Sequence, residues 1–253
     1  MRLLRSLFLF SCLLFSSVIM HAQDVQDIIK EADRLEAIPN EKEAFHKFKD
    51  ALKLQPVNLY ALTKCSELSS RIGAREADKH SRDNYNQAAI IYAKTALRLY
   101  PNSDEANVAM GIAVGRTLLT KSGKEKISLV KDIRHYAEYA IKINPQNFKA
   151  WHILGKWNYE VSNLNMLERA ATKVFYGGLP DASIKASIAA YEKARSLNPN
   201  FSLNYLELAK AYKKNNNKEK AIALLKQMLP IPILTEDDPR IKREAVQLIH
   251  SWE

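Results

Sequence analysis

A helical pattern that ends at a proline is repeated four times, and this repeat constrains the fold more than any other feature. Counting back from the proline, an alanine stands at five residues, and small or apolar residues stand at eight and twelve. These offsets share one face of an α-helix, and proline stops the helix because it has no N–H to donate. Each copy therefore predicts a helix that packs closely against a neighbour. The prolines and the residues aligned before them are Pro56 (Ala44, Phe48, Ala51), Pro101 (Ala89, Ala93, Ala96), Pro145 (Ile133, Ala137, Ala140) and Pro199 (Ser187, Tyr191, Ala194).

A second pattern follows the prolines at the distance expected for a partner helix. Trp151, Leu154 and Gly155 match the W-x2-L-G signature of the first helix of a tetratricopeptide repeat (TPR). Tyr205, Leu208, Ala209 and Tyr212 match it again, and a fifth second helix ends at Pro230. Unrelated amphipathic helices would not keep five pairs in one phase. The sequence predicts an all-α fold, an α-solenoid of about five TPR-like helical hairpins in a single domain over residues 23–253.

The repeats are longer than a plain TPR. The prolines are 45, 44 and 54 residues apart, against about 34 for an uninterrupted repeat. The excess is expected between the paired helices, at Ile72–Asn84, Lys121–Lys126 and Asn163–Ser183, with turns at Gly73, Gly123 and Gly177-Gly178. Within the last insertion, helical spacing predicts an extra helix over Leu164–Phe175, with Glu168 and Arg169 toward solvent or the groove mouth and Met166 and Phe175 packed inward. This helix is expected to form a lid-like edge of the concave surface. Asp181 or Ser183 is expected to cap the helix that follows.

The last helix of the chain is expected to cap the open end of the solenoid. Asp238 before Pro239 reads as an N-cap with proline in the first helical position. An amphipathic stripe then follows, made of Ile241, Ala245, Val246, Leu248 and Ile249.

Residues 1–22 have the pattern of a secretory signal peptide. Arg2 and Arg5 precede a charge-free apolar run from Ser6 to Met20, and Ala22 before Gln23 suits a cleavage site. The alternative is a retained membrane anchor, but the run is shorter than the ~20 residues that span a bilayer. We expect an exported chain, periplasmic or secreted, that begins at Gln23.

Composition excludes several classes of protein. Hydrophobic residues make up 47% of the chain and charged residues 26%, which indicates a folded protein. Two cysteines exclude a disulfide scaffold, and Cys65, the one that remains after cleavage, is expected to be buried. The histidines are scattered, without the i,i+3 or i,i+4 spacing of a helical metal site. No catalytic motif, cofactor loop or metal motif is recognisable, so we expect neither an enzyme nor a cofactor.

The net charge of +10 points to an anionic partner. On a helical wheel, several residues of the first helices point away from the packing face, toward the concave surface of a solenoid. This candidate groove comprises Arg116, Lys149, His152, Lys156, Tyr159, Leu206, Lys210 and Lys214. It suits an acidic protein segment, with an anionic lipid headgroup as the alternative. The same residues are also compatible with an ordinary solvent-exposed helix face that binds nothing. Nucleic acid is not expected, because the charge is spread along the chain.

One segment contains a residue pattern that the general TPR signature does not include. The run Leu154-Gly155-Lys156-Trp157-Asn158-Tyr159-Glu160-Val161, the Leu167-Glu168-Arg169 insertion and Phe175-Tyr176-Gly177-Gly178-Leu179-Pro180-Asp181-Ala182-Ser183 resemble the regulator of microtubule dynamics family of TPR-like proteins. The likeness is good from about Trp151 to Ile249. It implies the TPR-like fold and a role in microtubule association, organelle tethering or lipid handling. An exported chain would not meet cytosolic microtubules, so microtubule binding is not expected here.

Overall fold

The computed structural model describes residues 24–118 and 123–253, and every regular element within them is a helix. The predicted signal peptide lies outside these residues. Residues 24–37 are helical, and the helices that follow are α2 (Glu41–Leu54), α3 (Leu59–Arg75), α4 (Lys79–Leu99), α5 (Asp104–Thr117), α6 (Gly123–Ile143), α7 (Phe148–Ser162), α8 (Met166–Tyr176), α9 (Ile184–Leu197), α10 (Ser202–Lys214), α11 (Lys218–Met228) and α12 (Asp238–Trp252).

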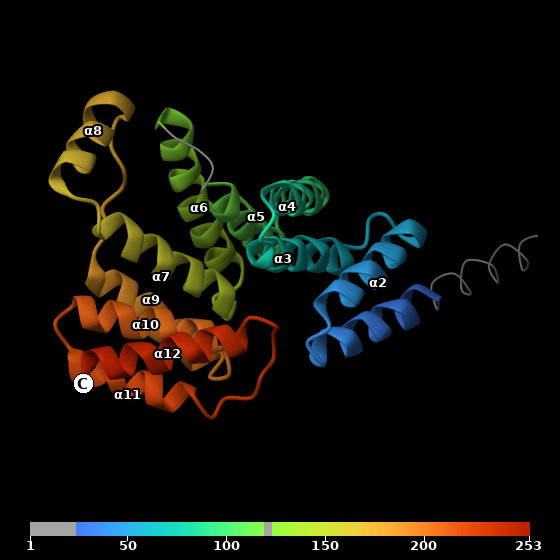
Figure 1. Cartoon of the computed structure of the whole chain (residues 1–253). Coiled ribbons are helices and arrows are strands. Elements are labelled where there is room, and N and C mark those ends of the chain that lie inside the picture. Colours follow the sequence, from blue (N-terminus) through green and yellow to red (C-terminus); the bar gives the residue numbers. More distant parts are fainter. Residues whose placement is uncertain (1–23, 119–122) are drawn as a thin grey trace, which may run out of the picture.

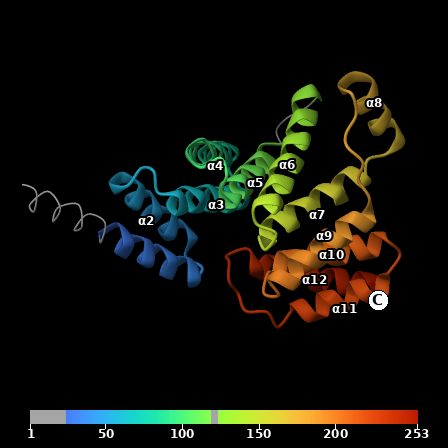
Figure 2. The ribbon, with the colours of Figure 1, turned by 180° about the vertical axis from the view of Figure 1, so that it is seen from behind.

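The helices stack as antiparallel pairs along the chain, which confirms the all-α solenoid (Figure 1). The first helices of the pairs are residues 24–37, α3, α5, α7 and α10. Their second helices are α2, α4, α6, α9 and α11, and α8 is inserted within the fourth pair. The reverse view shows the same order, with α12 packed over α10 and α11 at the C-terminal end (Figure 2).

The proline pattern marks the second helices as predicted. The aligned alanines Ala51, Ala96, Ala140 and Ala194 are fully buried. Each of these helices ends two residues before its proline. Three of the prolines are followed two residues later by an N-cap, because Asn58, Ser103 and Asn147 accept hydrogen bonds from the backbone N–H three residues on. One short motif thus ends one helix and begins the next.

The extra length of the repeats lies mostly in longer helices. The predicted turn at Gly73 is wrong, because α3 continues through Gly73 to Arg75 and the chain turns at residues 76–78. Asp78 then caps α4, where its side chain accepts from the Ser81 N–H. Gly123 begins α6, and residues 119–122 lie outside the described part of the chain.

The predicted helix in the third insertion is confirmed as α8, with bounds shifted by two residues at its start and one at its end. Asn165 and Glu168 form a reciprocal capping box, and Gly177 and Gly178 end the helix with φ of 72° and 80°. Ser183 caps α9 by accepting from the Ala186 N–H.

The side chains of α8 do not pack as the sequence predicted. Met166 is 87% exposed, so its inward packing is wrong; the side chain of Phe175 is not among those described. The reason is the position of α8, which projects from the body beside the start of α6 (Figure 1). Arg169 turns back and donates to the Val161 and Ser162 carbonyls at the end of α7.

The capping helix α12 is confirmed, with Ile241, Ala245 and Ile249 buried against α10 and α11. Asp238 is not its N-cap but its first residue. The buried Asp238 carboxylate accepts from the backbone N–H groups of Leu234 and Thr235, so it fastens the connection that precedes the helix.

Gly155 is the glycine of closest helix approach, and we expect Gly155→Ala to destabilise the protein. A Cβ there would lie 2.6 Å from Cδ1 of the fully buried Tyr191 ring. Overpacking costs about 1–3 kcal/mol, which exceeds the gain in helix propensity of up to about 1 kcal/mol. The midpoint of thermal unfolding should fall by several degrees.

Gly115→Ala is the matched control, because the nearest side-chain atom to its Cβ would be Ile133 Cδ1 at 4.0 Å. This variant should unfold at the wild-type temperature or above. Equal effects of the two substitutions would contradict the close packing of α7 on α9.

Candidate functional site

A cavity of about 240 Å³ lies on the inner side of the first helices, between α3, α5 and the start of α7. We call it the inner pocket. Eleven residues line it: Tyr60, Thr63, Lys64, Glu67, Asp104, Glu105, Val108, Asn144, Asn147, Phe148 and Lys149. None of the described side chains of α8 belongs to this lining.

Most polar groups of the inner pocket are already bonded within the chain. The Lys149 ammonium donates to both Glu67 carboxylate oxygens at 2.5 and 2.7 Å. The side-chain amides of Asn144 and Asn147 donate to Asp104 Oδ2 at 2.7 and 2.8 Å. These bonds hold α3, α5 and the start of α7 around a fixed, charged wall.

Glu105 is the exception. Its side chain makes no hydrogen bond and no ion pair within residues 24–118 and 123–253. Partial burial raises the pKa of Glu105, and the neighbouring Asp104 and Glu67 carboxylates raise it further, whereas the Lys149 and Lys64 ammonium groups act in the opposite direction without bonding to it. The inner pocket therefore offers one carboxylate that a cationic group would stabilise.

Ion pairs join the first helices across the inner face of the solenoid. We call this series the charge ladder; it consists of Glu36 with Lys64 and Arg71, Glu67 with Lys149, Lys156 with Glu207, and Lys210 with Glu207 and Glu244. The pair Glu67–Lys149 links α3 to α7 across 82 residues. This one pair thus ties two hairpins that are not neighbours in sequence.

Three of the predicted groove lysines are members of this ladder. Lys149, Lys156 and Lys210 do lie on the inner face, as the helical wheel indicated, but each is bonded to glutamates of the chain. Burial opposes the charge of Glu207, yet Lys156 and Lys210 outweigh it and hold the pKa of Glu207 below its usual range. These lysines are not free cations awaiting a ligand.

The other predicted residues have different surroundings. The His152 ring packs against Tyr191 and Phe201, and its Nδ1 is 2.9 Å from Asn204 Oδ1. Burial lowers the pKa of His152, so it is neutral at pH 7. Leu206 is 1% exposed, since it belongs to the core that α12 helps to cover, and its expected outward position is wrong.

Tyr159 packs against that same C-terminal core, with the Lys156 ammonium 5.7 Å from the centre of its ring. Lys214 is exposed at the end of α10. Arg116 is partly buried near the end of α5 and has no bonded partner among the described residues. Of the eight predicted groove residues, Arg116 and Lys214 are thus the cations left without a bonded partner in the described part of the chain.

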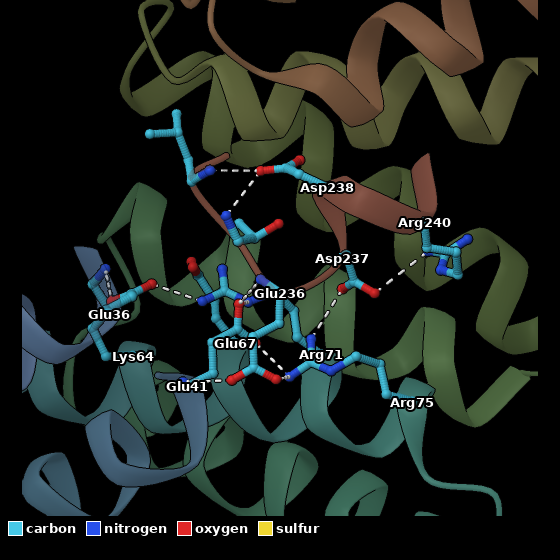
Figure 3. Close-up of polar contacts among 12 residues, drawn as sticks. Glu36, Glu41, Lys64, Glu67, Arg71, Arg75, Glu236, Asp237, Asp238 and Arg240 are labelled. Carbon is cyan, nitrogen blue, oxygen red and sulfur yellow. Dashed lines mark hydrogen bonds and ion pairs between the residues drawn. The ribbon is translucent and has the colours of Figure 1, made fainter. Parts of the chain in front are cut away.

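The connection between α11 and α12, residues 229–237, reaches back to the first hairpin (Figure 1). We call it the strap. Glu236 and Asp237 of the strap lie against Arg75 of α3, with N–O distances of 3.1 and 3.2 Å (Figure 3). Arg75 also bonds Glu41, at 2.6 Å.

The strap also supplies the cap that α2 lacks. Asn40, the residue before α2, makes no side-chain cap. Instead, the Glu41 N–H donates to Glu236 Oε1 at 2.8 Å, and the Glu236 N–H donates to Glu41 Oε1 at 3.3 Å. Glu41 is fully buried, and both Arg71 and Arg75 neutralise its carboxylate. The two ends of the solenoid are joined by this contact across 195 residues.

Sequence reasoning missed the acidic half of the inner face. Glu207 lies three residues before Lys210, and Glu160 lies four after Lys156, a spacing that indicates pairing within a helix. The long-range pairs of Glu67 and Glu41 leave no local signal. Cys65, by contrast, is buried as predicted, and burial raises the pKa of its thiol to about 12.

The described residues contain neither a metal-binding group nor a membrane-spanning helix. No three His, Cys, Asp or Glu side chains are grouped so that they could hold a metal ion. None of the described helices is both long and apolar enough to cross a lipid bilayer.

The stacked hairpins and their inner face define a TPR-like solenoid, a fold typical of protein-binding scaffolds. A thermophilic TPR protein of Thermus thermophilus has the same fold, with a TM-score of 0.65 at 15% identity, over 88% of this chain and 99% of that one.

The family is also clear. Residues 28–253 match the family described as Regulator of microtubule dynamics protein 1-3, and the chain belongs to it. Regulator of microtubule dynamics protein 1 of Bos taurus is 27% identical over 93% of this chain and 76% of its own length. The Mus musculus protein of the same name is 32% identical over 64% of this chain and 53% of its own length.

The Glu67–Lys149 pair predicts a pH-dependent effect of Lys149→Met. Burial alone would raise the pKa of Glu67, but Lys149 and Lys64 outweigh it and hold that pKa below its usual range. Without Lys149 a buried carboxylate loses its main partner, which costs about 3 kcal/mol of unfolding free energy at pH 7.

The penalty depends on pH. In the wild type, the pair stabilises above the unfolded pKa of about 4.3 and is lost as pH falls through the lower folded pKa. In Lys149→Met, the folded pKa of Glu67 is raised, so the penalty shrinks as pH falls through it. Urea unfolding at pH 7 and pH 4.5 measures this, with Lys214→Met as the control without a paired glutamate. A penalty that does not change with pH would contradict the assignment.

Proposed function

We propose that this protein is a scaffold that holds a segment of a partner polypeptide in the inner pocket. The observation that carries the proposal is the unpaired Glu105 in a pocket formed by the inner side of α3, α5 and α7. First helices of successive hairpins supply the binding surface of TPR-like solenoids. The family membership and the fold support the same class of function.

The partner segment is proposed to place a cationic side chain against Glu105. A lysine or arginine there would pair with the one free carboxylate and relieve its repulsion from Asp104 and Glu67. Tyr60, which is 37% exposed, and Phe148 add an aromatic wall for the aliphatic stem of such a side chain.

The expected acidic ligand draws no support from the lysines of the charge ladder, because they already have carboxylate partners. The alternative lipid ligand has the apolar part of the inner pocket in its favour, but an anionic headgroup would meet the carboxylates of Glu67, Asp104 and Glu105 there. For the inner pocket we therefore prefer a polypeptide segment with a cationic side chain to an acidic segment or a lipid.

Export remains part of the proposal. The residues directly after the expected cleavage site already belong to the fold: Val25, Ile29, Ala32 and Leu35 are buried in the first hairpin. A domain that begins at Gln23 would keep this core intact. The microtubule role in the names of the relatives is not proposed for an exported chain. Mass analysis of the native N-terminus should find Gln23, and a chain that retains Met1 would contradict export.

Photo-cross-linking in the producing cell tests the inner pocket. A benzoyl-phenylalanine in place of Tyr60 should join to a segment of a partner, and mass spectrometry should place a lysine or arginine near the joined residue. The same group in place of Ile91, which is 53% exposed on α4, reports the outer side of the solenoid. The two positions should give different adducts.

Glu105→Arg then tests the charge. The Tyr60 adduct should fall at least tenfold, because the reversed charge repels the proposed cation. Glu43→Arg changes an exposed glutamate of α2 in the same way and should leave the adduct unchanged. The proposal fails if Tyr60 yields no adduct, or if both charge reversals act alike.

A further inference from the structure

Helix α8 carries its apolar residues on the side that faces away from the body of the solenoid. Met166, Leu167 and Val174 are 87%, 80% and 75% exposed. At about 100° per residue these three side chains lie within about one third of the helix circumference, and the exposed Ala170 lies between them. We call these four residues the α8 face.

The contacts of α8 with the body fix this orientation. Thr172 is buried, and Arg169 donates to two backbone carbonyl groups at the end of α7. On the helical wheel both residues lie opposite Leu167 and Val174. The capping box and the left-handed Gly177 hold the two ends of the helix. An amphipathic helix normally buries its apolar side against its own protein, but here that side is turned to the solvent.

Positive charge surrounds the α8 face. Lys173 flanks it, is exposed, and makes no hydrogen bond or ion pair within the described part of the chain. Both views show α8 projecting beside the start of α6 (Figures 1 and 2). Lys124 and Lys126 are exposed in the first turn of α6 and also have no bonded partner among residues 24–118 and 123–253. The nearby acids are engaged, since Glu168 bonds a backbone N–H in the capping box and Glu125 has a partner of its own.

The size of the α8 face suits a lipid surface better than a folded partner. A stable protein interface buries about 800 Å² on each partner, whereas even an aromatic side chain covers only about 150–250 Å². Three aliphatic side chains on one short helix are therefore too few. At the boundary between headgroups and acyl chains, a few apolar side chains suffice, because lysines beside them add attraction to anionic headgroups.

We propose that α8 docks the protein on the surface of a bilayer that contains anionic lipids. The α8 face enters the boundary between headgroups and acyl chains, and the three lysines around it contact lipid phosphates. The helix lies in the surface and does not cross it. Because one short helix supplies the contact, docking is reversible and is weakened by salt. This inference goes beyond the inner pocket, since it concerns a different part of the solenoid.

Co-sedimentation with vesicles tests the proposal. The chain that begins at Gln23 is used, because the apolar run before it would bind lipid by itself. Vesicles of equal parts phosphatidylcholine and phosphatidylglycerol should bind it at low salt, and vesicles of phosphatidylcholine alone should bind it much more weakly. The double variant Leu167→Gln, Val174→Gln should reduce binding about tenfold, because it removes the inserted apolar groups without changing the charge.

The matched control removes two exposed apolar side chains elsewhere. Ile91→Gln with Val246→Gln alters α4 and α12 and should bind vesicles like the wild type. Circular dichroism checks that each variant is folded. The proposal is refuted if wild type does not sediment with the anionic vesicles, or if the two double variants bind them equally.

A fluorescent label reports insertion directly. The environment-sensitive dye NBD is attached to a cysteine in place of Val174, while Cys65 is protected because it is buried and burial raises the pKa of its thiol to about 12. Its emission should rise and shift to shorter wavelength when the anionic vesicles are added, and the same label in place of Ile91 should not change. Sedimentation without a change at position 174 would show that another surface binds the lipid and would overturn the role of α8.

A second copy of the chain is the competing occupant of the α8 face. If sedimentation equilibrium shows a dimer that Leu167→Gln, Val174→Gln converts to a monomer, and vesicle binding is the same for both, the membrane proposal is overturned. The two proposals of this article fail separately, because the Tyr60 cross-link reports the inner pocket and the vesicle assay reports α8.

Discussion

The structure depends on one contact, in which Arg75 gathers the carboxylates of Glu41, Glu236 and Asp237. In a solenoid each repeat normally touches only its neighbours, so the ends move independently. Here the strap between α11 and α12 lies against α2 and α3, near the start of the chain. The carboxylates would repel one another without the guanidinium groups of Arg75 and Arg71, and the N-terminus of α2 would have no side-chain cap without Glu236. We call this joining of the strap to the first hairpin closure. It requires both the arginines and the strap.

Closure also decides where a ligand has access. Toward the C-terminal end, α12 covers Leu206, and Lys156 and Lys210 are bonded to Glu207. Toward the N-terminal end, the inner pocket remains between α3, α5 and α7. Arg75 and Arg240 lie where the strap meets α3 (Figure 3). The inner face thus has a part that is filled by the chain's own side chains and an open part at the inner pocket.

The sequence predicts local structure well and long-range pairing poorly, for physical reasons. The prolines, the small residues before them and the caps act within one helix or turn, so their pattern survives in the sequence. The bounds of α8 in the sequence were predictable from the helical spacing of its apolar residues and from the glycines that follow it. Whether Met166 packs inward depends on what lies beside α8, and no local pattern records that. The pairing of Lys149 with Glu67 and of Lys156 with Glu207 depends on how the superhelix curves, which no local pattern records.

The most direct test of closure is a double-mutant cycle between Arg75 and Asp237, which lie 162 residues apart. Arg75→Ala, Asp237→Ala and the double variant are unfolded in urea at low salt. Closure predicts a coupling free energy of about 1 kcal/mol, because a partly exposed, geometrically defined pair contributes about that much. Effects that add within about 0.3 kcal/mol would show that the two residues do not interact, and would contradict a solenoid whose end is fastened to its beginning.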